Sequence, residues 1–564
     1  MMTLLLLLSA QAPNLIVHNA KIVTVDARFS MARAMAIRGD RIVAVGTDAR
    51  VMRLRGPQTT VIDLKGKTVM PGLIDSHTHA LDASLYEFDH EIPEMTGIPD
   101  VLAHIKERAR IVPEGEWIVM RQVFITRLKE QRYPTRAELD QVAPKHPVIF
   151  STGPDASVNS LGLKLNGIDK TTKSPVGQPG KVELDSVTGE PTGILRTYAA
   201  FVKSVPTGRQ PTTADKKAQL KLLMADYNSL GITSITDRAA TPSHIDIYRQ
   251  LRQEGGLSCR VFIDYHVTNP NREWNSVEAE IDAAAKDPLH KYDNMLWLRG
   301  LKVFLDGGML TGSALMREPW GKSSIYSITD PEYRGMRYIE PQRLYELARA
   351  SLKRDLQFTA HAVGDGAVTA LVNAYERVNQ EFPVREARPC LTHANFMTPE
   401  VIEKMAKIGI VADMQPAWLE LDGATLIKHF GLPRLRMFQP FATLFQNKIV
   451  VGGGSDHMQK IGGNRSVNPY HPFWGMWIAI VRKPRWTEQV LHESERITRE
   501  QAIRLYTINN AYLSFEEKEK GSLEAGKLAD FIVLDQDILT CPLEAIKTLK
   551  VEATYLGGKR IYQR

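Results

Sequence analysis

The feature that most constrains the fold of this chain is a series of apolar, strand-like segments that alternate with helix-like segments. Eight of these strand-like segments can be counted, at residues 72–79, 232–237, 260–267, 298–307, 356–364, 388–396, 409–416 and 448–456. Alternation of this kind is typical of α/β proteins with a parallel sheet. Eight units predict a (β/α)8 TIM-like barrel, whose active site lies at the carboxyl ends of the strands.

The chain has 564 residues, more than one compact core usually supports, so we expect parts outside the barrel. Short alternating strands at 13–70 and 515–564 predict one small β-sandwich built from both chain ends. The barrel is predicted at 71–514. Residues 85–205 are too many for one crossover connection, which predicts an inserted subdomain after the first barrel strand.

Charge and cysteine content narrow the classes of partner. The formal net charge is +7, but the basic residues are scattered and form no run interleaved with aromatics, which argues against nucleic-acid binding. After the N-terminus, no segment offers the roughly 20 uninterrupted apolar residues of a membrane helix, so we expect no stable membrane insertion. Three distant cysteines, Cys259, Cys390 and Cys541, argue against a disulfide framework, and the apolar runs beside Cys259 and Cys390 predict that these two are buried thiols. The sequence is compatible with a monomer and with an oligomer.

The N-terminus carries five leucines at 4–8 followed by Ser9-Ala10-Gln11-Ala12. An apolar stretch before Ala-x-Ala is similar to the end of a secretory signal, but this one is short and lacks a basic start. If it is a signal, the protein is periplasmic or secreted. If it is a simple leader, the protein is cytoplasmic.

Side chains of the metal-ligand type end several of the predicted strands. His77 and His79 close the first strand and project to the same side, because side chains on a strand repeat with period two. Imidazoles in such pairs are zinc ligands, although two surface histidines would give the same pattern. His361, His393 and Asp456 end the fifth, sixth and eighth strands. This recurrence predicts a metal site at the barrel rim.

Lys302 stands inside the fourth strand, between Leu301 and Val303. A bare ammonium group is costly to bury there. One solution is chemical, because a neutral amine can take up carbon dioxide and become a carbamate, an anion able to bridge two metals. The alternatives are an ion pair with Asp306 or a side chain that reaches the rim.

Other residues near the strand ends have weaker interpretations. His266 ends the third strand, and we expect a structural histidine held by hydrogen bonds. The aromatic residues Trp418, Tyr470, Trp474 and Trp477 follow the seventh and eighth strands. Aromatics at such spacing usually pack in a core or a lid, so no substrate residue is predicted.

Longer motifs run through nearly the whole chain. They include "VIDLKGKTVMPGLIDSHTH", "SVNSLGLKLNGI", "VTGEPTGILR", "LKVFLDGGML", "HAVGDGAV", "LTHANF", "GGGSD" and "GSLEAGKLADFIVLD". With these motifs the chain resembles the amidohydrolase superfamily, in its amidohydrolase-3 branch of YtcJ-like and N-substituted formamide deformylase-like proteins.

The resemblance implies a ligand set for two metal ions. His77, His79 and Asp456 would hold the more buried ion. His361 and His393 would hold the second, with carboxylated Lys302 bridging both. Zinc is expected, as one or two ions per chain, with manganese or iron as substitutes. Many relatives have a proline two residues after the Asp of strand eight, where this chain reads His457 and Met458.

These features predict a metal-dependent hydrolase that cleaves a non-peptide carbon–nitrogen bond in a small linear amide, N-acyl amine or N-formyl amine. A metal lowers the pKa of bound water from about 15.7 to roughly 7 and so supplies hydroxide at neutral pH. Asp456 would accept the proton of the attacking hydroxide and pass it to the departing nitrogen.

Three other functions fit the same residues. A mononuclear aminohydrolase that deaminates a ring amidine needs the His-x-His pair, a further histidine and the Asp, but no carbamate on Lys302. A non-catalytic scaffold protein could share the barrel, although no ligand is missing here. A carbon–oxygen hydrolase or an isomerase could use the same metal platform.

Overall fold

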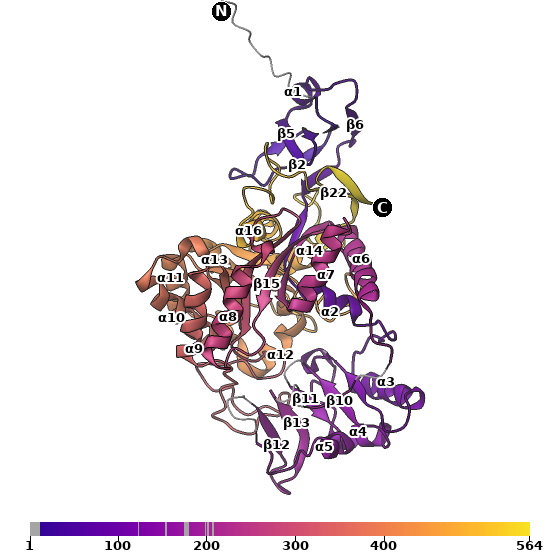
Figure 1. Ribbon diagram of the computed structural model, residues 1–564, viewed down its shortest axis with the longest axis vertical. Helices are drawn as coiled ribbons and strands as arrows, with labels where there is room; N and C mark the ends of the chain where they lie inside the picture. Colours follow the sequence, from indigo (N-terminus) through magenta and orange to yellow (C-terminus); the bar gives the residue numbers. More distant parts are fainter. Residues whose placement is uncertain are drawn as a thin grey trace, which may run out of the picture.

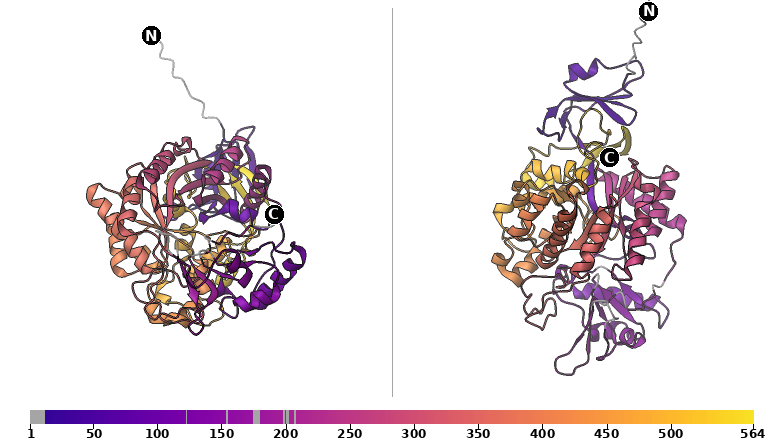
Figure 2. Two further views of the ribbon diagram at one scale, coloured as in Figure 1. Left: turned by 60° about the horizontal axis from the view of Figure 1, so that its bottom comes forward. Right: turned by 60° about the vertical axis from the view of Figure 1, so that its left-hand side comes forward.

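The computed structural model describes residues 12–564 apart from 122, 153–154, 174–179, 198, 200–201 and 206–207. Most of the candidate signal at residues 4–12 therefore lies outside the described residues. The described part has a barrel at its centre, with a β-rich unit at each end (Figures 1 and 2). Among the described residues, we find no helix with the length and hydropathy needed to span a bilayer.

The central sheet confirms the predicted barrel. Its eight neighbouring strands are parallel, and each overlaps one of the eight predicted segments. They are β8 (Leu73–Thr78), β14 (Ile232–Ala240), β15 (Arg260–His266), β16 (Leu296–Phe304), β17 (Gln357–Ala362), β18 (Cys390–His393), β19 (Val411–Met414) and β20 (Val451–Gly453). Backbone hydrogen bonds from Asp456 to His77 (2.9 Å) and from His79 to His457 (2.8 Å) close the ring.

Helices surround this barrel on its outer face (Figure 2). They are α2 (Ala80–Leu85), α6 (Thr213–Ser229), α7 (Pro242–Gln253), α8 (Trp274–Ala285), α9 (Pro341–Leu352), α10 (Asp365–Glu381), α11 (Pro399–Ile408), α12 (Ala417–Arg434), α13 (Phe441–Gln446), α14 (Pro472–Val481), α15 (Arg499–Leu505) and α16 (Ile508–Leu513). Because protein covers both faces of the sheet, the barrel strands are buried on both sides. This burial explains their continuous apolar runs.

Local signals fix where these helices begin and end, and α11 is an example. The Thr398 side chain accepts a hydrogen bond from the backbone N–H of Val401, and Pro399 occupies the first turn. Gly409 ends the helix at a φ of 90°, a left-handed conformation that glycine adopts without strain. The chain therefore turns directly from the helix into β19.

Strands from the two chain ends form two sheets at one end of the barrel (Figure 1). One contains β5 (Arg41–Gly46), β4 (Ala34–Arg38), β1 (Leu15–His18) and β6 (Thr60–Asp63) in that order. The other contains β23 (Lys559–Gln563), β22 (Val551–Leu556), β21 (Phe531–Leu534), β7 (Thr68–Pro71), β2 (Lys21–Val23) and β3 (Met31–Ala32). Buried residues of both sheets, such as Val17 and Phe531, share one core. The predicted composite sandwich is present.

The segment after β8 builds a further unit at the opposite end of the barrel (Figure 1). Its sheet has the order β12 (Lys181–Leu184), β13 (Pro191–Arg196), β11 (Ala156–Val158), β10 (Val148–Ser151) and β9 (Ile118–Met120). Its helices are α3 (Ile98–Ile111), α4 (Arg136–Val142) and α5 (Ser160–Leu165). We propose the boundaries 13–70 with 515–564, 71–514, and 85–205 for the sandwich, the barrel and the insertion.

Candidate metal centre

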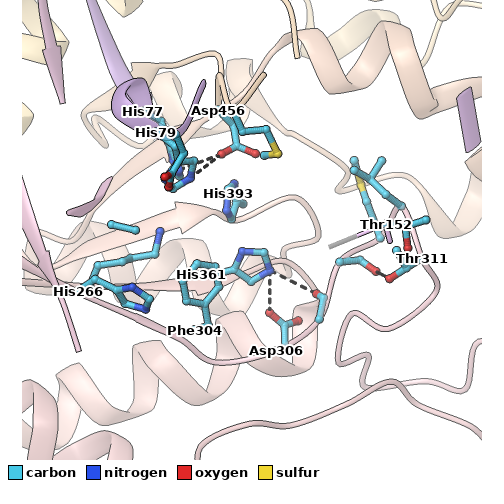
Figure 3. A pocket seen from close by; sticks show the side chains of 18 of the residues that line it. His77, His79, Thr152, His266, Phe304, Asp306, Thr311, His361, His393 and Asp456 are labelled. Carbon is cyan, nitrogen blue, oxygen red and sulfur yellow. Dashed lines mark hydrogen bonds and ion pairs between the residues drawn. The ribbon is translucent and has the colours of Figure 1, made fainter. Parts of the chain in front are cut away.

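A cavity of about 510 Å³ opens at the carboxyl ends of the barrel strands, and all six predicted site residues line it (Figure 3). They are His77, His79, Lys302, His361, His393 and Asp456. They come from β8, β16, β17 and β18 and from the segment that follows β20. Side chains separated by up to 379 positions therefore converge on one point, as a parallel barrel requires of residues at its rim.

His77, His79 and Asp456 form the tightest group. The Nε2 atoms of His77 and His79 lie 3.1 and 3.2 Å from Oδ1 of Asp456. One ligand atom from each residue lies within 4.8 Å of the other two, a spacing able to hold a metal ion. Burial opposes ionisation of Asp456, but the adjacent imidazoles outweigh it and hold the pKa of this carboxyl well below its ordinary value.

His361 and His393 continue this group across the cavity (Figure 3). The ring of His393 lies 4.9 Å from that of His77 and 4.4 Å from that of His361, between centroids. Burial, reinforced by Lys302, lowers the pKa of His361 to about 3. Burial and the neighbouring His361 lower the pKa of His393 well below its ordinary value. Both rings are therefore neutral near pH 7, the form that binds metals.

The orientation of two rings is set by hydrogen bonds on the side away from the cavity. Nδ1 of His77 lies 2.8 Å from Oδ2 of Asp413, and the other oxygen of this carboxylate, Oδ1, accepts a hydrogen bond of 2.6 Å from Ser76. Nδ1 of His393 lies 2.7 Å from Oε1 of Gln415. Such contacts leave the Nε2 atoms toward the cavity and fix the ring of a metal-binding histidine.

Lys302 is fully buried, and its Nζ has no hydrogen-bond partner among the described residues. Its nearest aromatic contact is the ring of Phe304, at 5.2 Å. Asp306 does not pair with it, because that carboxylate accepts hydrogen bonds from the backbone of Leu315, Val363 and Gly364. Burial, with the nearby Arg238, lowers the pKa of Lys302 to about 8. The amine is therefore partly neutral at mildly basic pH.

Two of the six residues have a backbone conformation that is rare outside glycine. The φ angles of His393 and Asp456 are 75° and 54°. Non-glycine residues in this region cost about 1–3 kcal/mol and gather at functional sites. This observation favours a functional rather than a purely structural origin for the cluster.

The geometry agrees with the comparison of the sequence with known proteins. The pattern described as "Amidohydrolase family" matches residues 60–562. The chain belongs to this family. The predicted resemblance is thereby confirmed.

Two curated relatives and one solved structure show the range of similarity. The N-substituted formamide deformylase of Arthrobacter pascens is 29% identical over 98% of this chain and 99% of its own length. The putative amidohydrolase YtcJ of Bacillus subtilis is 26% identical over 94% and 98%. An uncharacterised metal-dependent hydrolase from Pyrococcus horikoshii shares the fold, with a TM-score of 0.67, 20% identity and coverage of 94% and 99%.

The structure also shows where the remaining candidate residues lie, for which the sequence indicated no firm role. His266 lines the cavity, packs against the ring of Phe304 and makes no side-chain hydrogen bond within the described part of the chain, so the expectation of a hydrogen-bonded structural histidine is wrong. His457 is buried and bonded to Tyr227, turned to the protein interior. Of the four aromatics, Trp418 alone lines the cavity among the described residues, whereas Trp474 borders a separate one.

The sequence did not point to Asp413 or to the insertion residues Phe124 and Thr152, which also line or support the site, and it suggested Asp306 only as an ion-pair partner of Lys302. Asp413 carried a usable signal, since it is an acid in an otherwise apolar barrel strand. Phe124 and Thr152 carried none, because nothing local indicates that the insertion reaches the cavity.

The unpartnered lysine gives the first prediction, for protein free of metal and bicarbonate. The folded pKa of Lys302, about 8, lies below the value of about 10.4 in an unfolded chain. Between these pH values the unfolded chain holds more protons, so stability rises with pH. Lys302→Met, of similar size, should therefore be more stable than the wild type at pH 7, by on the order of 3 kcal/mol.

The stability gain should shrink as the pH rises from 8 toward 10.5, because the wild-type amine is then neutral in both states. Thermal denaturation of both proteins across this pH range measures it. Lys145→Met, at an exposed lysine, is the control and should change little. A Lys302→Met protein less stable than the wild type at pH 7 would contradict the buried, unpaired amine.

Proposed function

We propose that this protein is a metal-dependent hydrolase that cleaves a non-peptide carbon–nitrogen bond in a small linear amide, N-acyl amine or N-formyl amine. The observation that carries the proposal is the set of six donor side chains around one cavity, with the buried Lys302 Nζ left without a hydrogen-bond partner among the described residues. Membership of the amidohydrolase family and similarity to a formamide deformylase support it.

The donor set fits a metal better than it fits any internal interaction. Buried polar atoms are nearly always hydrogen-bonded, so the unpartnered Nζ of Lys302 at this cavity favours a ligand from outside the chain. Neutral imidazoles and a carboxylate are the ligands of zinc, and manganese or iron could replace it. His77, His79 and Asp456 would hold one ion, and His361 and His393 the other.

Lys302 would link the two ions as a carbamate. Its nitrogen would attack carbon dioxide, lose a proton and become an anion with two donor oxygens. Burial favours this step, because it keeps part of the amine neutral and so nucleophilic. The metal ions would balance the negative charge of the carbamate, so it would need no cationic side chain of the protein beside it.

Cleavage of the scissile bond would depend on several groups with different roles. A bound metal supplies Lewis acidity and lowers the pKa of water. Asp456, ionised beside His77 and His79, would accept the proton released by the attacking oxygen. It would then deliver that proton to the departing nitrogen, which is a poor leaving group as an amide anion. Trp418, stacked on His393 at 4.9 Å, would exclude water from that side.

A mononuclear aminohydrolase is the second candidate, and one observation favours it. Among the described residues, His77, His79 and Asp456 form a compact three-residue group, and neither His361 nor His393 belongs to that 4.8 Å set. A single ion would need no carbamate. Metal content per chain separates the two.

Asp456→Asn tests the proton-transfer role. The amide keeps an oxygen donor but cannot accept the proton, so kcat for an N-formyl or N-acyl amine should fall at least about 100-fold while much of the zinc stays bound. Steady-state kinetics and elemental analysis of one sample measure both. Turnover equal to that of the wild type would remove Asp456 from the mechanism.

Lys302→Met tests the paired-ion site. Wild-type protein expressed with zinc and bicarbonate should bind two ions per chain, and Lys302→Met at most one, because the bridging anion is lost. Elemental analysis measures the ratio, with surface Lys145→Met as the control. One ion per chain in the wild type, unchanged by the substitution, would favour the mononuclear aminohydrolase instead.

A further inference from the structure

The cavity has an apolar wall made of Phe124, Met309, Leu310 and Trp418. All four side chains are buried. They come from three separate parts of the chain: the insertion, the segment after β16 and the start of α12. A group attached to the scissile bond that extends away from the six donor residues would meet this wall. Contact with it favours a hydrophobic group.

The segment that carries Met309 and Leu310 is fixed by the insertion. Arg196, buried on β13, donates a hydrogen bond of 2.7 Å to the carbonyl of Thr311. Asp155, which pairs with Arg196 at 3.3 Å, accepts a hydrogen bond of 2.6 Å from Ser313. A buried ion pair therefore anchors the segment that carries Met309 and Leu310 through hydrogen bonds to Thr311 and Ser313.

The cavity also lacks a cation able to receive a carboxylate. No arginine lies among the described residues that line it, and Lys302 is the one lysine among them. Lys302 belongs to the donor group itself, where the scissile bond must lie. The internal positions outside the described ranges hold neither lysine nor arginine in the sequence. Three lining residues are acids, namely Asp82, Asp306 and Asp456.

The two remaining imidazoles of the cavity each lie against another side chain. The ring of His266 packs on the ring of Phe304, with 5.3 Å between centroids. Nε2 of His244 lies 3.6 Å from Oδ1 of Asp82, so any positive charge on that ring already has a partner.

We propose that the substrate is an uncharged amide that carries a hydrophobic group, and that amides with a carboxylate next to the scissile nitrogen are rejected. This inference rests on the proposed function and names its substrate class. A carboxylate next to the scissile nitrogen would lose its hydration and would meet no arginine and no lysine other than Lys302 in the cavity lining. N-acyl amino acids are therefore excluded, although their scissile bond is the same.

Three matched substrates test the proposal with zinc-loaded wild-type protein. They are N-formyl-2-phenylethylamine, N-formylphenylalaninamide and N-formylphenylalanine, which differ by a hydrogen, a neutral carboxamide and a carboxylate at one carbon. Formate release gives kcat/KM for each. We expect the carboxylate substrate to be at least about 100-fold poorer than the carboxamide, which has nearly the same size. A carboxylate substrate as good as the carboxamide would overturn the inference.

A pair of variants tests whether the apolar wall causes the discrimination. Leu310→Arg places a cation on the wall, and Leu310→Gln is the matched uncharged control. The carboxamide-to-carboxylate ratio of kcat/KM should be at least about tenfold lower in Leu310→Arg than in Leu310→Gln. An equal ratio in the two variants would show that this wall does not decide the charge preference.

The same experiments distinguish failure of the proposed hydrolase function from failure of the proposed substrate class. If neither these three compounds nor a wider set of N-formyl and N-acetyl amines is hydrolysed by zinc-loaded protein, the amide hydrolase itself is wrong and the inference falls with it. If the amines are hydrolysed but the N-acyl amino acid is preferred, only the substrate class is wrong.

A second, independent observation concerns Asn468, between β20 and α14. Its Nδ2 donates hydrogen bonds to the backbone carbonyl of Asp456 (2.7 Å) and to Oδ2 of the same residue (3.1 Å). The other carboxylate oxygen, Oδ1, faces His77 and His79. The two oxygens of Asp456 therefore have different partners, and Asn468 fixes which one points to the histidines.

The amide of Asn468 is itself held in one orientation. Its Oδ1 accepts hydrogen bonds from Nη1 of Arg127 (2.8 Å) and from Nε1 of Trp418 (3.2 Å). Arg127 belongs to the insertion and is paired with Asp422 at 2.9 Å. A flipped amide would face donors with its NH2 group, so the observed orientation is the stable one.

We infer that Asn468 is a positioning residue for Asp456. In Asn468→Ala, kcat should fall about 10- to 100-fold while KM and the zinc content per chain stay near the wild-type values. Asn464→Ala, an exposed asparagine on the same segment, is the matched control and should leave all three unchanged. Unchanged kcat in Asn468→Ala, or a fall explained wholly by lost zinc or unfolded protein, would overturn this role.

Discussion

The constraint on which this site depends is the burial of an amine that has no internal hydrogen-bond partner. A buried donor without a hydrogen bond costs about 1–3 kcal/mol, and a buried charge costs more. Lys302 Nζ carries this cost at the cavity that the histidines and Asp456 also line. A fold selected for stability alone would replace such a lysine with an apolar residue. A partner from outside the chain, such as a metal with a carbamate, removes the cost.

The protein below the site is built to keep these groups in place. Arg238 on β14 pairs with Asp264 on β15 at 2.8 Å and lies 3.4 Å from Asp413 on β19. Asp413 in turn holds the ring of His77. Gly300 leaves the room that Asp264 needs, since a Cβ there would lie 1.5 Å from its carboxylate. Charged side chains thus link strands across the barrel interior, and each has a partner.

Recognition and reactivity come from different parts of the chain. The barrel strands supply the six donor residues, whereas the insertion and the segment after β16 supply the apolar wall and its support through Arg196. Segments outside the strands vary more freely than the barrel without loss of the core. This arrangement explains why family membership follows from the strand-end motifs, while the substrate class has to be argued from Phe124, Leu310 and Trp418.

The eight strands, the composite sandwich and the insertion can be predicted from the amino-acid sequence. The same is true of the six donor residues at the rim, namely His77, His79, Lys302, His361, His393 and Asp456. Strand periodicity and the ends of apolar runs are local properties, so they can be read along the chain. The contact of Asp413 with His77, the hydrogen bond of Asn468 to Asp456 and the place of His266 at the cavity are seen only in the folded chain. These contacts join residues whose pairing depends on barrel closure and loop packing, for which no local pattern exists.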